Sequence, residues 1–562
     1  MKQSKRFLRA LLAVILVLAL LTVTTATAAA AKTKTIASGV CGAEGDGANL
    51  KWKLDNKGTL TISGSGPMED FVLLSDGSPT KFTSAPWWME HRYDVKNAVI
   101  KSGVTSIGDY AFDSLDLLES ISLPDTLESI GYSAFWGCEQ LRALRIPDSV
   151  TSIGEYMCGY CREIKTLKIS ESLTTISADA FYYCSSLKSV VIPESVTVLE
   201  RASFYYCTSL ESVKLPSHLT EIGDYVFSMC NLNDIQLPDT LTKVGYGALH
   251  AKNPKELVLP EGLLEIGAEA FHFPELEHIV LPSGLTKISS CMLSGCPKVT
   301  DLIIPDSVTR FEYGAIAGCA NVSELIIPDG VTSIDAGAFY GIGNRTVTIP
   351  RNVTEMGRCV LQGCDKLEHV KITNDMEILP EGMFENCGAL KSVVLPASLK
   401  AVDIYAFLRC EQLSDVYFLG TEEQWNQLEI KERNEPLLQA TVHYHTADHS
   451  VTETPAVPST CSAKGHTAGV YCNDCGVYLS GNDAAPLLRH AWGDWQMIKE
   501  PTTDAAGTLQ RTCADCGATQ QETVDPLPKP DGNESKDSPT FLEKIAQWFR
   551  DLFAKIAAFF KF

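Results

Sequence analysis

Two cysteine pairs near the C-terminus have the residue types and the spacing of metal ligands. Cys472 and Cys475 lie in "YCNDCG", and Cys513 and Cys516 lie in "TCADCG". Two such turns can hold one tetrahedral Zn²⁺ through four thiolates, which leaves no coordination position for a substrate. Disulfides and free thiols stay open as alternatives, because the 37 residues between Cys475 and Cys513 exceed the usual zinc-ribbon spacing. Zinc is therefore a candidate structural cofactor, and the sequence calls for no other.

The sequence around the two pairs is itself repeated, as "PSTCSAKGHTAGVYCNDCG" and "EPTTDAAGTLQRTCADCG". Cys461, His466 and His490 are additional candidate ligands in the first copy, and the second copy lacks them. This asymmetry argues against one zinc ion in each copy. The segment resembles the small Cys-pair modules that are appended to exported bacterial surface proteins. We predict tandem modules over residues 450–526, followed by a linker over 527–539.

The segment "HYHTADH" is a second candidate for metal chemistry. His443, His445, Asp448 and His449 nearly match the H-x-H-x-D-H motif of metallo-β-lactamase-like hydrolases, but the segment is one residue too long. The rest of the chain also lacks the alternating helices of that fold. The sequence contains no H-E-x-x-H motif, no G-x-S-x-G motif and no glycine-rich phosphate loop. We predict that the protein is not an enzyme. A hydrolase that uses His443 and His445 is retained as an alternative hypothesis.

Most of the chain is a repeat, which is visible in "FYYCSSLKSVVIPESVTVLERASFYYC" because this stretch begins and ends with the same four residues. A proline that follows a short β-rich run recurs at steps of 22 or 23 residues, or of twice that length. These prolines are Pro124, Pro147, Pro193, Pro216, Pro238, Pro260, Pro282, Pro305, Pro328, Pro350 and Pro396. Such a period is typical of a solenoid, in which each unit is buried only by its neighbours.

Each unit carries two apolar sets, one on either side of its proline. In "LKSVVIP", Val190 and Ile192 face one side while Ser189 and Val191 face the other, which is the alternation of a strand. Proline ends the strand because it has no N–H to donate to a ladder. The following "VTVLERASF" supplies the second apolar set, which is Val196, Leu199, Ala202 and Phe204.

This unit resembles the leucine-rich repeat of the BspA-like family of bacterial surface proteins, because the proline, the glycine of "IG" and the "AF" pair all recur in phase. The resemblance implies a curved solenoid with a parallel sheet on its inner face, and a role in adhesion without naming a ligand. We predict an α/β-type repeat solenoid, strand-dominated, with 22–23-residue leucine-rich units and a C-terminal cap over residues 96–445. An N-terminal β cap module precedes it over 35–95, in which "LKWKLDNKGTLTISG" predicts a hairpin.

Ten cysteines occupy one position of the repeat, namely Cys138, Cys161, Cys184, Cys207, Cys230, Cys296, Cys319, Cys364, Cys387 and Cys410. Exported chains usually pair their cysteines. Side chains at the same phase of parallel turns point the same way, however, which is poor geometry for a disulfide. We predict reduced, buried thiols. Cys158, Cys291 and Cys359 fall in or just before the next turn and are predicted to be core residues as well.

The candidate binding residues lie at the outward strand positions. Four consecutive turns place an apolar residue there, and these are Val258, Val280, Ile303 and Ile326. Two positions earlier, the same strands carry Glu256, His278, Asp301 and Glu324, and the outward column continues through Lys371, Val394 and Tyr417. Contiguous exposed apolar residues indicate a partner-binding face, although β-branched residues also favour strands for their own sake. Because aromatic residues are scarce in this column, a protein or peptide partner is favoured over a glycan.

Composition and the N-terminus bear on where the protein acts. The chain has 562 residues, a formal net charge of −22 and a pI of about 5.0, which argues against a nucleic-acid partner. A basic head with Lys2, Lys5 and Arg6 precedes an apolar run and the small residues Ala26-Thr27-Ala28. We predict a signal peptide over residues 1–28, with an uncleaved membrane anchor as the alternative.

The last 23 residues, 540–562, have the periodicity of an amphipathic helix. Charges interrupt the segment throughout, so it predicts a helix that lies on a membrane surface rather than one that spans it. Packing on another helix is the alternative. The candidate membrane-facing residues are Ile545, Trp548, Phe549, Leu552, Phe553, Ile556, Phe559 and Phe560.

These observations predict an exported, extracellular protein that is associated with the cell surface and binds protein partners in an adhesion-like manner, with host matrix or mucosal proteins as candidates. The binding residues would be those of the outward apolar run and its flanking column. The alternative is a non-catalytic envelope scaffold that self-associates through the tail and the solenoid.

Overall fold

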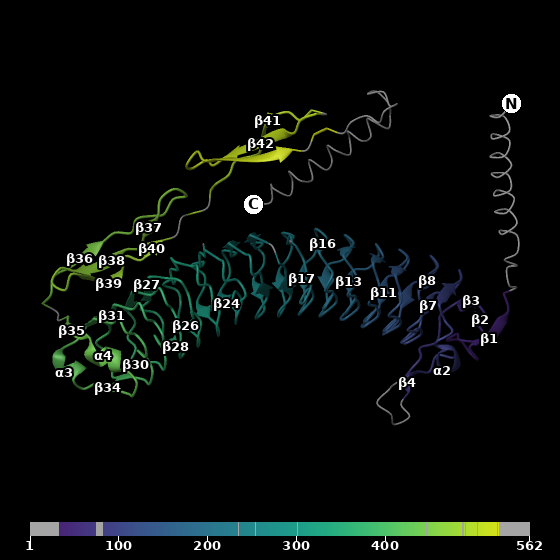
Figure 1. Ribbon diagram of the computed structural model, residues 1–562, viewed down its shortest axis with the longest axis horizontal. Helices are drawn as coiled ribbons and strands as arrows, with labels where there is room; N and C mark the ends of the chain where they lie inside the picture. Colours follow the sequence, from purple (N-terminus) through teal and green to yellow (C-terminus); the bar gives the residue numbers. More distant parts are fainter. Residues whose placement is uncertain are drawn as a thin grey trace, which may run out of the picture. The chain divides into compact units, whose positions relative to one another are not determined.

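The computed structural model describes residues 33–74, 82–524 and 526–527, apart from residues 234, 253, 301, 446–447, 486–487, 489 and 503. The predicted signal peptide, most of the linker, and the amphipathic helix with its candidate membrane-facing residues lie outside the described residues. The chain divides into two units, which are residues 1–173 with 179–187, and residues 174–178 with 188–562. The colours of Figure 1 follow the sequence through both units.

The first unit begins with a β cap, in which an antiparallel hairpin is joined edge to edge with parallel strands in one sheet. The predicted hairpin is confirmed, since β2 (Leu50–Asp55) pairs antiparallel with β3 (Thr59–Gly64). Gly58 closes its turn with a φ of 79°, a left-handed conformation that favours glycine. β3 then pairs in parallel with β6 (Asn97–Ile100), so the cap ends on a strand that the first repeat extends. The remaining elements of this region are β1 (Thr35–Val40), β4 (Leu73–Leu74), β5 (Phe82–Thr83) and α2 (Trp88–His91).

In most turns the first half of the repeat forms a short strand that pairs in parallel with an equivalent strand, whereas residues 235–238, 302–305 and 322–328 have no strand assigned. In the first unit these strands are β6, β8 (Ser120–Ser122), β10 (Ala143–Arg145) and β12 (Thr166–Lys168). In the second unit they are β14 (Ser189–Val191), β16 (Ser212–Lys214), β20 (Glu256–Val258), β23 (His278–Val280), β27 (Thr346–Ile349), β29 (His369–Ile372), β31 (Ser392–Leu395), β33 (Asp415–Phe418) and β35 (Thr441–Tyr444).

The second half of each repeat forms another row of parallel strands, each two residues long, and not a helix. In the first unit these are β7 (Ser106–Ile107), β9 (Ser129–Ile130) and β11 (Ser152–Ile153). In the second unit they are β13 (Thr175–Ile176), β15 (Val198–Leu199), β17 (Glu221–Ile222), β18 (Lys243–Val244), β21 (Glu265–Ile266), β24 (Lys287–Ile288), β25 (Arg310–Phe311), β26 (Ser333–Ile334), β28 (Glu355–Met356), β30 (Ile378–Leu379), β32 (Ala401–Val402) and β34 (Glu429–Ile430), with β19 (Leu249–His250) and β22 (Phe271–His272) as an additional pair. The fold is therefore the strand-dominated solenoid that the sequence predicts.

The core lies between the two rows and is shared between turns. Val190 and Ile192 are buried, whereas 61% of Val191 between them is exposed, which confirms the predicted alternation. The phenylalanine of the "AF" position is fully buried, and rings of consecutive turns contact each other in pairs such as Phe112–Phe135, Phe204–Phe227 and Phe384–Phe407. The ring centroids of Phe112 and Phe135 lie 5.3 Å apart in the first unit, and those of Phe384 and Phe407 lie 5.2 Å apart in the second. A single unit has no partner for such a side chain, so neighbouring turns stabilise each other.

The cysteine column is part of this core. All ten of its members are buried, as predicted, and they are free thiols in the described residues. The Cys138 thiol donates to the carbonyl oxygen of Phe112 at 3.1 Å, and the Cys387 thiol donates to that of Leu361 at 3.0 Å. Burial raises the pKa of Cys296 to about 12, so this thiol stays protonated at neutral pH.

The prediction for the three remaining solenoid cysteines is only partly right. Cys158 is fully buried, but Cys291 and Cys359 are half-buried. Both lie at a turn position with left-handed backbone, with φ of 51° and 55°. The equivalent position in other repeats also has positive φ and holds residues as different as the exposed Glu269 and the buried Ala202, so the turn conformation does not by itself bury the side chain there.

The second unit continues beyond the repeats into a closing region and a small all-β segment. The closing region contains α3 (Glu422–Trp425) and α4 (Glu435–Gln439), which with α2 are the helices of the described residues. The all-β segment then forms three antiparallel sheets, made of β36 (Val451–Thr454), β38 (Gly469–Cys472) and β39 (Val477–Gly481); of β37 (Gly465–His466) and β40 (Ala484–Ala485); and of β41 (Gln496–Lys499), β42 (Gly507–Thr512) and β43 (Thr519–Val524). We call residues 450–524 the C-terminal segment. Within the part of the chain that is described, no helix has the length and apolar character needed to cross a bilayer.

We expect the shared core to make adjacent residues of one turn respond very differently to truncation. Phe339 is fully buried, whereas 48% of its neighbour Tyr340 is exposed. Phe339→Ala should lower the local free energy of unfolding by about 3–5 kcal/mol, because it leaves a cavity. Tyr340→Ala should cost less than about 1 kcal/mol. Native-state hydrogen exchange of the amides in the flanking turns measures both changes, and similar protection losses in the two variants would contradict a core centred on the phenylalanine column.

We also expect the column thiols to remain reduced in protein purified without a reductant. Thiol titration should detect them only after denaturation, because their sulfur atoms are buried. A disulfide between neighbouring column members, for example Cys364 and Cys387, in a peptide map of the unreduced protein would contradict this arrangement.

Candidate binding face and cysteine–histidine clusters

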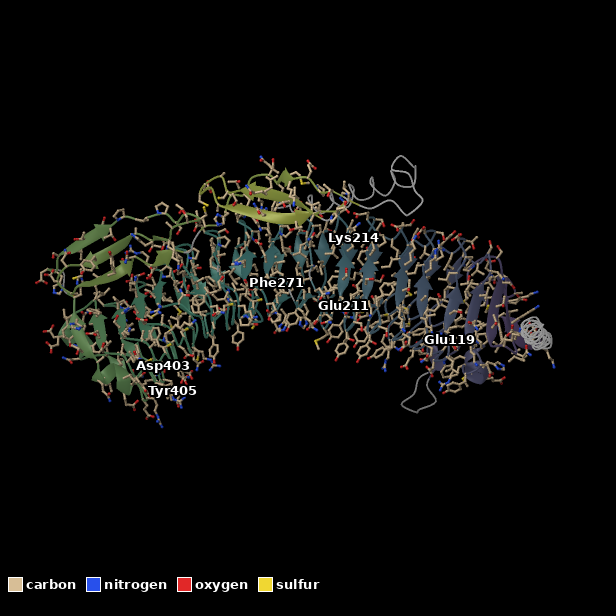
Figure 2. The ribbon with its side chains drawn as sticks, turned by 45° about the horizontal axis from the view of Figure 1, so that its top comes forward. Glu119, Glu211, Lys214, Phe271, Asp403 and Tyr405 are labelled. Carbon is tan, nitrogen blue, oxygen red and sulfur yellow. The ribbon has the colours of Figure 1, made fainter. Side chains whose placement is uncertain are left out.

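The outward side of the first halves of the repeats presents the predicted apolar run, with Val258 in β20 and Val280 in β23, and with Ile303 and Ile326 at the equivalent position of the next two turns, where no strand is assigned. Val258, Val280 and Ile326 are half-buried and 44% of Ile303 is exposed, while the residues that flank each of them in sequence are buried. Val258 pairs in register with Val280, and Glu256 pairs with His278. We call Val258, Val280, Ile303 and Ile326 the apolar run. Figure 2 labels Lys214, which occupies the same outward strand position in an earlier turn.

The column beside the apolar run is only partly acidic at its surface. Glu256 is exposed and His278 is half-buried. The Glu324 carboxylate forms an ion pair with Lys464 of the C-terminal segment, and Asp301 lies outside the described residues. This column therefore already accepts one basic side chain from elsewhere in the same unit.

Farther along, the outward positions are covered, which the sequence did not predict. Only 6% of Lys371 and 4% of Val394 is exposed. The Lys371 ammonium lies 3.0 Å from the Asp483 carboxylate and also donates to the carbonyl oxygen of Gly481, so the C-terminal segment rests on β29 here. A charged side chain tolerates such burial only when it is paired. The sequence predicts one continuous outward column. In the structure, the apolar run of this column is partly exposed, whereas Lys371 and Val394 are covered.

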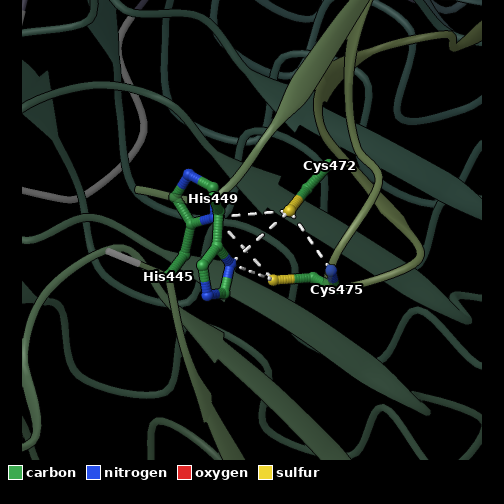
Figure 3. A group of neighbouring side chains, drawn as sticks. All are labelled: His445, His449, Cys472 and Cys475. Atoms are coloured by element: carbon green, nitrogen blue, oxygen red, sulfur yellow. Dashed lines mark hydrogen bonds between the residues drawn. The ribbon is translucent and has the colours of Figure 1, made fainter. Parts of the chain in front are cut away.

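A first cysteine–histidine cluster joins the end of the solenoid to the C-terminal segment. His445 follows β35, His449 precedes β36, and Cys472 and Cys475 lie on the β38–β39 hairpin (Figure 3). The Cys475 sulfur lies 3.2 Å from Nδ1 of His449 and 3.7 Å from Nδ1 of His445. The Cys472 sulfur lies 3.4 Å from Nδ1 of His445 and 3.7 Å from Nδ1 of His449. The ligating atoms of all four residues lie within 4.8 Å of one another.

A second cluster of the same size lies within the C-terminal segment. Cys513 and Cys516 lie on the β42–β43 hairpin, and Cys461 and His490 come from the loops before it. The sulfur atoms of Cys461 and Cys513 are 3.8 Å apart, and the Cys516 sulfur lies 3.2 Å from Nδ1 of His490. These four ligating atoms also lie within 4.8 Å of one another.

The structure does not bring the two Cys-x-x-Cys pairs together into the single four-thiolate site that the sequence suggests, because each pair lies on its own hairpin. Cys461 and His490, noted as extra ligands of the first copy, instead accompany the second pair. His466 joins neither cluster, and its Nδ1 lies 3.1 Å from the carbonyl oxygen of Thr467. His443, which the hydrolase hypothesis paired with His445, lies 2.8 Å from the Asp415 carboxylate.

Sequence reasoning missed His445 and His449 as partners of the first cysteine pair. The available signal is their spacing of four residues on the N-terminal side of the first Cys-x-x-Cys pair. The pKa of His445 is lowered by burial and by the neighbouring His449, which favours the neutral imidazole.

The thiols of the second cluster also differ from those of the solenoid. Burial raises the pKa of Cys513, but hydrogen bonds from the backbone N–H groups of Cys516 and Asp515 and from His490 outweigh it and lower the pKa to about 6. The lowered pKa favours the thiolate, in contrast to the protonated thiol of Cys296 in the solenoid core.

The first unit carries an aromatic cluster that sequence reasoning did not assign to any surface. The ring centroids of Trp136 and Tyr160 lie 4.8 Å apart. The ring of Tyr160 also stacks on that of Tyr183, with 4.9 Å between the centroids. The Arg162 guanidinium lies 5.5 Å from the centroids of both tyrosines. The sequence indicates this cluster through the repeated "FYYC" and "GYC" stretches, because each places a tyrosine directly before a cysteine of the column.

Comparison with protein families identifies the repeat. A family model described as the BspA type leucine rich repeat region matches in six copies over residues 90–211, 198–323 and 312–428. The chain belongs to this family. Proteins built from these repeats act as protein-interaction scaffolds and are typically not enzymes. No curated protein matches the chain.

Several solved structures are similar to the chain at low identity. A leucine-rich repeat protein from Bacteroides ovatus is 20% identical, with 71% of this chain and 98% of that chain covered and a TM-score of 0.41. A leucine rich cell surface protein from Faecalibacterium prausnitzii is 23% identical, with 68% and 96% covered and a TM-score of 0.34. A leucine-rich repeat protein from Eubacterium ventriosum is also 23% identical, with 68% and 84% covered and a TM-score of 0.29.

The buried ion pair predicts how firmly the C-terminal segment rests on the sheet. Asp483→Ala should cost about 3–5 kcal/mol, because it leaves the buried Lys371 ammonium unpaired. Lys464→Ala, which removes a more exposed lysine, should cost about 1 kcal/mol or less. Hydrogen exchange of the β39 amides should rise strongly in the first variant and little in the second. Equal exchange in both variants would contradict a segment held by the Lys371–Asp483 pair.

Proposed function

We propose that this chain is an exported protein of the cell surface that binds protein partners in an adhesion-like manner through the outward face of its strand sheet. The observation that carries the proposal is the apolar run, where consecutive turns leave apolar side chains partly exposed at the same position of the repeat. Exposed apolar residues that are contiguous are uncommon on monomers and tend to mark binding surfaces.

The chemistry of the face favours a partner that presents apolar side chains beside basic ones. Glu256 and Glu324 flank the apolar run, and Glu324 already pairs with a lysine of the C-terminal segment. The net charge of −22 favours basic partners as well. Host matrix and mucosal proteins are the class of partner that we would test first.

The cell-surface part of the proposal rests on the N-terminal segment and on the family. Residues 1–28 have the order of a secretory signal, with a basic head, an apolar run and small residues. Several similar repeat proteins come from bacteria, and one of them is described as a cell surface protein. Residues 540–562 would add a second contact with the envelope.

A capture experiment tests the proposal. Purified protein covering residues 29–539 is incubated with a panel of matrix and mucosal proteins, beside the variant Val280→Glu, Ile303→Glu, Ile326→Glu. We expect the dissociation constant of a captured partner to rise at least tenfold, which is about 1.4 kcal/mol, because three carboxylates would have to be desolvated.

A matched control is available at the same strand position in other turns. Ser122→Glu, Val191→Glu, Gln236→Glu adds the same charge at exposed residues outside the apolar run, and it should leave capture unchanged. Circular dichroism confirms that both variants fold. Equal affinity of the two variants, or no capture by the unaltered protein, would overturn the proposal and favour an envelope scaffold.

A further inference from the structure

The two cysteine–histidine clusters have the composition and the size of two separate metal sites. We infer that the chain binds two structural zinc ions, one through His445, His449, Cys472 and Cys475, and the other through Cys461, His490, Cys513 and Cys516. The first site has two thiolates and two imidazoles, and the second has three thiolates and one imidazole.

The distances within each cluster fit a single tetrahedral ion. Zinc binds sulfur at about 2.3 Å and histidine nitrogen at about 2.0 Å, so the ligand atoms around one ion lie about 3.3–3.8 Å apart. The four sulfur–nitrogen distances of the first cluster run from 3.2 to 3.7 Å. The second cluster has a sulfur–sulfur distance of 3.8 Å and a sulfur–nitrogen distance of 3.2 Å.

The donor set selects zinc over other ions. Thiolate and imidazole are poor ligands for Mg²⁺ and Ca²⁺, which prefer oxygen, whereas tetrahedral sulfur–nitrogen sites suit zinc. A [2Fe–2S] cluster with two histidines would place its cysteines and histidines on different irons. Here both cysteines of the first cluster lie close to both histidines, which fits one ion between them.

Disulfides account for the clusters less well. The second cluster contains three cysteines, so any pair formed within it would leave one thiol over. A disulfide in the first cluster would give no reason for Nδ1 of two histidines to point at the sulfur atoms. All cysteines of both clusters are free in the structure.

The hairpins themselves have the backbone of zinc-binding turns. Gly476 and Gly517 directly follow the second cysteine of each pair and have φ of 70° and 72°, which favours glycine. The N–H of Cys475 donates to the sulfur of Cys472 at 3.2 Å, a contact that stabilises a thiolate ligand.

The C-terminal segment also needs an additional source of stability. Its hydrophobic cluster consists of Trp495, Leu509 and Val524, with Met497 packed against it. Segments with so little core usually depend on metals or disulfides. The first zinc would tie the end of the solenoid to the β38–β39 hairpin, and the second would tie the loop of Cys461 to the β42–β43 hairpin.

Metal analysis of the purified full-length chain, by inductively coupled plasma mass spectrometry, tests the inference. After reduction, addition of zinc and exhaustive dialysis, we expect two zinc ions per chain. Cys475→Ser and Cys461→Ala should each retain one ion, and the double variant should retain none. A single four-thiolate site would instead bind one ion and would lose it completely in Cys475→Ser.

Histidine variants supply a matched comparison within one short stretch. His445→Ala should lose one ion, whereas His443→Ala, two residues away and hydrogen-bonded to Asp415, should retain both. His445→Cys should keep two ions, and in the cobalt-substituted protein it should add thiolate-to-metal charge-transfer absorption. This variant separates the loss of a ligand from a failure to fold.

Fewer than two zinc ions per chain in the unaltered protein, or equal metal contents of the His443→Ala and His445→Ala variants, would overturn the inference. A loss of two hydrogen masses from Cys472 and Cys475 in protein kept reduced and supplied with zinc would also overturn it, because it would show a disulfide. With both ions removed by a chelator, hydrogen exchange should rise in residues 450–524 and remain unchanged in the repeats before Cys410.

Discussion

The stacking of one repeat turn on the next is the interaction on which the rest of this structure depends. A unit of 22 or 23 residues has apolar side chains on both of its halves and cannot bury them alone. Fully buried residues such as Phe135 and Phe407 are covered by the equivalent residues of neighbouring turns. The first turn therefore needs the β2–β3 hairpin and the last needs the region of α3 and α4, because an end without such a cover would expose a complete layer of core.

Stacking also separates the residues that make the fold from those that are available for binding. Inward strand positions are restricted to apolar residues that match the next turn, whereas outward positions change freely from turn to turn. This is why the outward column can hold Val191 in one turn and Lys214 in the next while their strands β14 and β16 stay paired in register. A repeat of this kind provides a surface whose chemistry varies from turn to turn, which suits a protein-interaction scaffold.

Cysteine has two opposite roles in this chain, and its surroundings decide between them. In the solenoid, the column thiols fill small core positions, those of Cys138 and Cys387 donate to carbonyl oxygens, and burial keeps the Cys296 thiol protonated. In the C-terminal segment, few apolar residues are available, and cysteines gather with histidines at distances that suit a metal ion. One type of side chain thus serves as core in one part of the chain and as ligand in the other.

The sequence by itself determined the repeat, the alternation of its strands, the buried cysteine column and the hairpin of the cap, because each of these depends on residues close together in the chain. It did not determine which residues meet across long distances. The pairing of Lys371 with Asp483 and of Cys461 with Cys513 joins positions 112 and 52 residues apart. Periodicity gives no information about such pairs, since neither lies within one repeat unit. Only the tertiary structure decided that part of the outward column is covered and that the two Cys-x-x-Cys pairs belong to separate clusters, because both depend on how the C-terminal segment folds back on the sheet and on itself.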